Sequence, residues 1–132
     1  MFATTQMGGA HVAIPDVCHP GPAPSALAAP IPATNVALPA MGIGAAHDVL
    51  FMNAPAHTLA TTIPSSTTTP VCGPGFASGT TMGPARSLTG SSTVLAGGVP
   101  ATRLGALTMS NGTNASGATI SPSQLKVVIL AR

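Results

Sequence analysis

The sequence repeats one short pattern in two stretches, Val49–Leu59, VLFMNAPAHTL, and Val94–Leu104, VLAGGVPATRL. The second copy begins 45 positions after the first, and Val, Leu, Pro, Ala and Leu coincide without a gap. In each copy a Val-Leu pair precedes a tight Asn or Gly turn, and Pro-Ala leads into a second short strand, which is typical of a β-hairpin. The C-terminal residues 123–130, SQLKVVIL, resemble the first strand of a third copy that is cut off after its turn.

Repeated hairpins have to share one core, because a single two-stranded hairpin is marginally stable in water. The repeats near residues 48–65 and 92–110, with the strand at 123–130, therefore predict three units around one axis. We expect a mainly β fold: a small conical domain of repeated β-hairpins in a pseudo-three-fold arrangement, with little or no helix. Such a surface matches a trimeric partner, and one chain could cap the end of one trimer.

The composition is that of one small domain over residues 1–132. Charged residues make up 5% and aromatic residues 2% of the chain, and the net charge is +2. The chain therefore offers neither a basic stripe nor an aromatic platform for nucleic acid. Its 15 glycines and 14 prolines leave no apolar run long enough for a membrane helix, and the proline-rich segment 15–40 is expected to be extended. Glutamate is absent and the N-terminus has no signal-peptide pattern, so we expect neither an enzyme nor a secretory precursor.

The segment Gly90–Thr108 resembles the signature of the PAAR family, a Pro-Ala-Ala-Arg motif that follows a Thr-Val-Leu strand and a glycine turn. The motif here reads Pro100, Ala101, Thr102 and Arg103, and the earlier copy begins with Pro55 and Ala56. The run from Cys18 through residues 30–37, PIPATNVA, is similar to the N-terminal part of the PAAR-like subfamily. For Arg103 two roles remain open, a bridge to backbone carbonyls of a neighbouring hairpin or a solvated surface position.

This resemblance implies a structural protein that caps the distal end of a trimeric β-helical (VgrG-like) spike in a contractile injection system, such as a type VI secretion system. One chain per spike trimer would sharpen the spike for membrane puncturing and help effector delivery. Such a tip would be assembled in the bacterial cytoplasm and ejected with the spike. No toxin domain is expected in residues 1–132. The family's Gly-Asp after the motif is Gly105-Ala106 here, and the His or Cys usual soon afterwards is replaced by Ser110-Asn111.

Because of that departure, a metal site has to be argued from the residues themselves. A structural zinc needs four thiolate or imidazole ligands, and the chain holds four histidines and two cysteines. We expect a zinc ion bound by the turn-rich set His11, Cys18, His19 and Cys72, with His57 in reserve. A closed zinc site would replace the core that a small tip cannot bury. The alternative is that Cys18 and Cys72 form a disulfide or are small buried apolar residues, while the histidines are ordinary surface residues.

Two further functions compete with the spike tip. One is an Ala/Thr/Gly-rich β-solenoid that binds a repetitive surface such as ice or polysaccharide. That function requires regularly spaced threonines on one face, whereas Thr67–Thr69 and Thr80–Thr81 are clustered. The other is a small metal-binding or redox protein, which the absence of a Cys-x-x-Cys motif disfavours.

Overall fold

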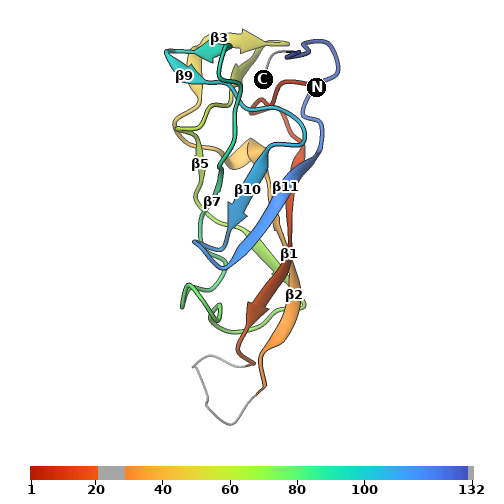
Figure 1. Cartoon of the computed structure of the whole chain (residues 1–132), viewed down its shortest axis with the longest axis vertical. Coiled ribbons are helices and arrows are strands. Elements are labelled where there is room, and N and C mark those ends of the chain that lie inside the picture. The colour runs from red at the N-terminus through yellow and green to blue at the C-terminus, as the bar shows by residue number, and fades with distance from the viewer. Residues whose placement is uncertain (21–28, 131–132) are drawn as a thin grey trace.

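The computed structural model describes residues 1–20 and 29–130, and it is mainly β (Figure 1). Its strands are β1 (Ala10–Cys18), β2 (Ile31–Ala37), β3 (Ala46–Phe51), β4 (Ala54–Ala56), β5 (Thr62–Ile63), β6 (Thr67–Thr69), β7 (Ala85–Ser87), β8 (Leu95–Ala96), β9 (Val99–Pro100), β10 (Leu107–Ser110) and β11 (Ala115–Ser121). Among the described residues the helical content is a single 3-10 turn, Pro39–Met41, and none of these residues forms a helix able to cross a membrane. The predicted fold class, mainly β with little helix, is confirmed.

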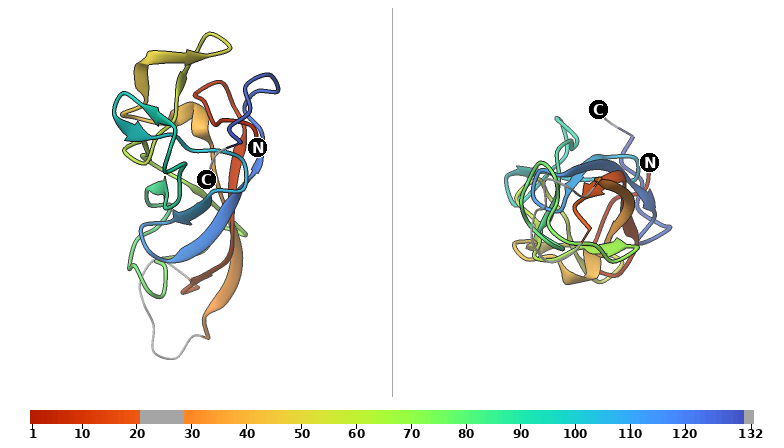
Figure 2. Two further views of the ribbon diagram at one scale, coloured as in Figure 1. Left: turned by 45° about the horizontal axis from the view of Figure 1, so that its top comes forward. Right: turned by 90° about the horizontal axis from the view of Figure 1, so that it is seen from below.

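One antiparallel sheet forms the long part of the molecule, which we call the shaft. Its seven strands follow the order β5-β7-β10-β11-β1-β2-β6. The sheet curls around an enclosed interior, as the end-on view in Figure 2 shows. At one end of the shaft lie the small two-stranded sheets β3-β4 and β8-β9 together with the N-terminus, and at the other end lie the end of β1 and the start of β2 (Figure 1).

The strands of the shaft were not predicted as such, because their sequences carry weak β signals. The segment 15–40 was expected to be extended and polyproline-like, yet its ends lie in β1 and β2, and residues 21–28 with Pro22 and Pro24 lie outside the described residues. Pro15 is tolerated inside β1 because the β1–β2 register shifts between Ala13 and Asp16, which frees that position from the hydrogen-bond ladder. Gly117 is required in β11, since a Cβ there would overlap the backbone of Val12 and Ala13.

The interior of the shaft holds a small apolar cluster of Ala37, Ile63 and Ala85 and a polar network around one buried carboxylate, that of Asp16. Oδ2 of Asp16 accepts hydrogen bonds from Nδ2 of Asn35 at 2.9 Å and from Oγ1 of Thr68 at 2.8 Å. Its Oδ1 accepts from Nδ2 of Asn111 at 3.2 Å and from Nδ2 of Asn114. The carboxylate therefore ties β1 to β2, to β6 and to the turn between β10 and β11.

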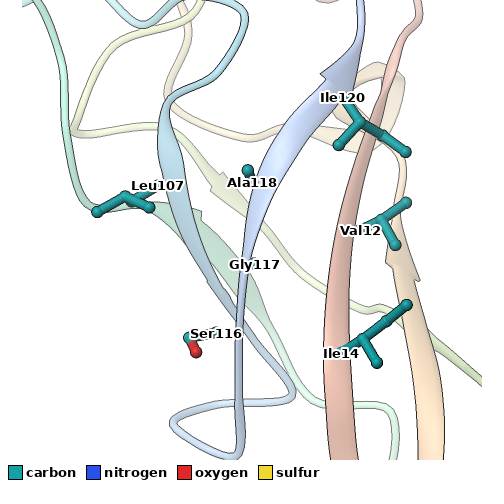
Figure 3. Close-up of a pocket in the computed structure, with 7 residues that line it drawn as sticks. All are labelled: Val12, Ile14, Leu107, Ser116, Gly117, Ala118 and Ile120. Atoms are coloured by element: carbon teal, nitrogen blue, oxygen red, sulfur yellow. The ribbon is translucent and has the colours of Figure 1, made fainter.

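The outer face of the shaft carries an open apolar groove over β10, β11 and β1 (Figure 3). Its most exposed side chains are Ile14 and Ile120, both 62% exposed, and Leu107, 56% exposed. Eight threonines are buried instead, namely Thr4, Thr5, Thr58, Thr61, Thr68, Thr102, Thr108 and Thr119. The arrangement does not favour the solenoid alternative, because this outer sheet face is apolar and offers no regular row of threonines.

Candidate functional site

Three hairpin-like units meet at the end of the shaft that holds the N-terminus, and together they form what we call the base. The first unit is the hairpin β3-β4, in which Phe51 pairs with Ala54, and the second is β8-β9, in which Ala96 pairs with Val99. The third is assembled from residues 1–6 and 127–129. In it Phe2 pairs with Val128, the amide of Ile129 donates to the carbonyl of Met1 at 2.7 Å, and the Met1 ammonium donates to the carbonyl of Ile129 at 3.1 Å.

A closed cycle of backbone hydrogen bonds links the three units. The amide of Thr4 donates to the carbonyl of Thr102 at 3.0 Å, Thr102 donates to His57 at 2.9 Å, and His57 donates to Thr4 at 3.0 Å. Each residue of the cycle therefore gives one bond to the next unit and receives one from the previous unit. This is the pattern of a three-fold axis, made here from one chain.

A second cycle runs in the opposite sense. The amide of Gln6 donates to the carbonyl of Pro55 at 3.1 Å, and that of Leu59 donates to Pro100 at 3.0 Å. The cycle closes where the amide of Leu104 donates to the carbonyl of Phe2 at 2.8 Å. The isolated bridges repeat the same relation, in the pairs Thr5 with Ala56, Thr58 with Ala101 and Ala3 with Arg103.

The core of the base consists of equivalent small residues from the three units. Ala56 and Ala101 are fully buried and Ala3 is 1% exposed, so the three backbones approach closely at the axis. Val49, Val94 and Val127 pack around these alanines. The predicted strand at 123–130 is not formed as a regular strand; an isolated bridge joins Val128 to Phe2, so the N-terminal residues supply the second half of the third unit and the unit is not cut off after its turn.

The outward side of each unit carries one exposed apolar side chain at an equivalent position. Leu50 pairs with Pro55, Leu95 with Pro100 and Val128 with Phe2. The exposed fractions of these three side chains are 53% for Leu50, 56% for Leu95 and 45% for Val128. The base therefore presents three similar apolar positions, related by the axis of the hydrogen-bond cycles.

The third unit gives a direct test, because it lacks only the turn that the other units have. Joining Ile129 to Met1 through Gly-Gly copies the turn Gly97–Gly98, and the chain can then be opened between those two glycines. We expect this circular permutant to fold with a melting temperature within about 5 °C of the parent, since every strand pairing survives. Differential scanning calorimetry measures it. A permutant opened between Gly117 and Ala118, inside β11, is the control and should fail to fold. If the permutant opened between Gly97 and Gly98 also fails to fold, the three-unit base is contradicted.

The motif residues predicted for docking build this base. Pro55 and Ala56 lie in β4, Pro100 ends β9, and Ala101 and Thr102 follow it with their side chains buried. The backbone of Arg103 pairs with that of Ala3 in the third unit. Ala56, Ala101 and Thr102 are buried, whereas Pro55, Pro100 and Arg103 are partly exposed and Leu50, Leu95 and Val128 are exposed.

The proposed zinc ligands are not brought together, and the prediction of that ligand set is corrected by the structure. Cys18 and Cys72 form a disulfide, the alternative left open by the sequence, with their Cα atoms 6.1 Å apart. A sulfur in a disulfide is not a thiolate and does not serve as a zinc ligand of the predicted kind. His11 lies near the opposite end of β1 from Cys18, and among the described residues no three His, Cys, Asp or Glu side chains are grouped for a metal.

The histidines His11 and His57 are buried at the junction of base and shaft. Nδ1 of His11 lies 2.7 Å from Oγ1 of Thr119, and the backbone of His57 belongs to the hydrogen-bond cycle. Burial lowers the pKa of His11 to about 4. Burial, and to a lesser degree the charge of His11, lowers the pKa of His57 to about 4. Both imidazoles are therefore neutral near pH 7, and His57, the reserve ligand, serves as a packed core residue.

Comparison with known proteins gives one match. A family model described as a toxin PAAR-like domain matches residues 9–117. No curated protein and no solved structure matches. The matched range includes β1 to β10 and both sequence repeats but not residues 1–6 and 127–129, which form the third unit of the base.

Proposed function

Because the chain belongs to the toxin PAAR-like domain family, we propose that it is a structural spike tip that caps a trimeric β-helical (VgrG-like) spike of a contractile injection system. The observation that carries the proposal is the base, in which one chain presents three equivalent units around one axis. A three-fold partner can contact all three units in the same way only if a single chain sits on its axis. The stoichiometry is therefore one tip for each spike trimer.

The base supplies two kinds of contact for such a partner. Leu50, Leu95 and Val128 offer apolar area at three equivalent positions, and the short strands beside them offer backbone groups. Burying three partly exposed aliphatic side chains provides a hydrophobic contribution on the order of a few kcal/mol. The opposite end, which carries the disulfide, then points away from the spike.

The far end fits a leading position in membrane puncturing. Val71 and Phe76 are 79% and 62% exposed there, and the segment 70–82 contains no charged residue. We propose that the chain is assembled in the bacterial cytoplasm and is ejected with the spike. We propose a structural role for it and no reaction.

Native mass spectrometry of the chain with a trimeric β-helical (VgrG-like) spike protein tests the proposal. We expect one tip bound to three spike chains. The double variant Leu50→Asp, Leu95→Asp places two charges in the contact and should weaken binding at least 100-fold, while the fold is retained because both side chains are exposed. Leu107→Asp is the matched control, since Leu107 is equally exposed but lies on the shaft. The proposal fails if the stoichiometry differs from one to three, or if the base variant and the shaft variant bind alike.

A further inference from the structure

The end of the shaft opposite the base is closed by a segment that lies along the end of β1, and we call this region the tip. The amide of His19 donates to the carbonyl of Pro74 at 2.9 Å, and the amide of Gly73 donates to the carbonyl of His19 at 2.8 Å. The amide of Phe76 donates to the carbonyl of Val17 at 2.8 Å. The ring of His19 packs on that of Phe76, with 5.3 Å between centroids. The disulfide Cys18–Cys72 lies within this contact.

The residues of the tip do not fit a metal. A four-ligand site would have to use both sulfurs, which are bonded to each other, and would need His11 within reach. His11 is separated from Cys18 by seven positions along β1, which corresponds to about 20 Å of strand. His19 packs on Phe76, and its Nδ1 is buried without a hydrogen-bond partner in the described structure. The disulfide therefore occupies the role of a crosslink that a metal would otherwise supply.

We propose that the Cys18–Cys72 disulfide is the covalent crosslink of the tip in place of a metal, and that it locks the segment Cys72–Phe76 onto β1 only in oxidising surroundings. Without it, that segment is held by the three backbone hydrogen bonds above and by Asn114, whose Oδ1 accepts from the amide of Ala77 and whose Nδ2 donates to the carbonyl of Val17. The crosslink joins residues 54 positions apart, so it closes a long loop of the unfolded chain. This inference holds whether or not the base binds a spike.

The difference in exposure between the two sulfurs determines which cysteine reacts first with an oxidant. Cys72 is partly exposed, whereas Cys18 is fully buried in β1. With a small-molecule disulfide as the oxidant, the Cys72 thiolate attacks one of its sulfurs, forms a mixed disulfide and releases the first small thiolate. The Cys18 thiolate then attacks the Cys72 sulfur and displaces the second. The two cysteines lose two protons and two electrons, and the oxidant is reduced to two thiols.

The test compares the unmodified chain in its oxidised and reduced forms, so it depends on no substitution. Purified without reductant, the chain should contain no thiol that reacts after denaturation, and its mass should be lower than that of the reduced chain by two hydrogens. Reduction should lower the melting temperature by about 10 °C or more. It should also raise hydrogen exchange at the amides of Gly73 and Phe76 at least tenfold more than at the amides of Thr4 and Thr102 in the base.

Zinc distinguishes the proposal from its alternative. One equivalent of zinc added to the reduced chain should restore neither the melting temperature nor the protection of Gly73 and Phe76. The variant Cys72→Ser should behave as the reduced chain in the absence of reductant, and Ser78→Ala, in the same region, should keep the oxidised behaviour. Restoration by zinc would overturn the proposal, as would equal protection of these amides in the oxidised and reduced forms.

Discussion

Replacing Asp16 with asparagine should destabilise the chain by about 3–5 kcal/mol, which lowers the melting temperature by roughly 10–20 °C. The buried carboxylate accepts hydrogen bonds from the side chains Asn35, Thr68, Asn111 and Asn114. An asparagine at position 16 would present an Nδ2 donor where these side chains also present donors. Buried donors would then face one another without an acceptor.

The side-chain amides of Asn111 and Asn114 cannot relieve this conflict by rotating. Oδ1 of Asn111 accepts from the amide of Gly83 at 2.8 Å and from Oγ1 of Thr80 at 3.0 Å. Oδ1 of Asn114 accepts from the amide of Ala77 at 2.7 Å. A flipped amide would lose these bonds, so Nδ2 of Asn111 and Nδ2 of Asn114 have to face position 16.

Denaturant unfolding at pH 7 measures the effect, and Asp48→Asn provides the control because Asp48 is the other acidic residue and is exposed. That control should change stability by less than about 0.5 kcal/mol. A loss below about 1 kcal/mol for Asp16→Asn would show that the amide network does not hold the shaft together.

The carboxylate also defines how the chain responds to acid. Burial by itself raises the pKa of Asp16, but the hydrogen bonds from Asn114, Asn35, Thr68 and Asn111 together outweigh it, so the pKa is lowered from the ordinary value of 3.8. A lowered folded-state pKa means that the stability contributed by the ionised form is complete above pH 3.8 and is lost as the pH falls through the folded-state value.

The hairpins β3-β4 and β8-β9 of the base could be predicted from the sequence, because each requires a tight turn followed by Pro-Ala, and these residues recur at the same spacing in both copies. Residues 123–130 indicated a third unit, but its N-terminal half could not be recognised, since Phe2-Ala3-Thr4 lacks the proline that begins Pro55-Ala56-His57 and Pro100-Ala101-Thr102. What these segments share is a set of backbone hydrogen bonds, and every residue type has the same backbone groups.

The shaft and the tip escaped prediction for a different reason. The β1 strand contains Pro15 and the buried Asp16, and β11 contains Gly117 next to β1, so local propensities oppose strands that the sheet as a whole stabilises. Cys18 can pair with Cys72 only because the chain between them returns to the end of β1. The spacing of the six His and Cys residues in the sequence does not indicate that return.

Lowering the pH from 7.5 to 5 should reduce the free energy of unfolding by about 4 kcal/mol, because His11 and His57 are buried as neutral imidazoles. Burial lowers the pKa of each from 6.5 to about 4, with a smaller contribution of the His11 charge to the pKa of His57. These side chains are 2% and 3% exposed, so solvent screens them little.

The free energy of unfolding falls as the pH is lowered because the unfolded chain binds protons that the folded chain does not. Below pH 6.5 the unfolded chain binds a proton on each histidine, while the folded chain binds none until the pH approaches 4. Each histidine therefore removes up to about 1.4 kcal/mol of stability per pH unit in this window, or about 2 kcal/mol by pH 5. This window lies above the one in which the Asp16 contribution is lost, so the two effects are separable in one titration.

Urea unfolding at pH 7.5, 6.5, 5.5 and 4.5 measures the slope of stability against pH, which is informative even for a variant that is less stable at every pH. His57→Gln should roughly halve the slope, since one buried imidazole remains, and His11→Gln should do the same. His47→Gln removes an exposed histidine and should keep the slope of the unmodified chain. If the slope between pH 6.5 and 4.5 is flat, or if His47→Gln reduces it as much as His57→Gln does, then the buried pair does not control the acid stability of the base.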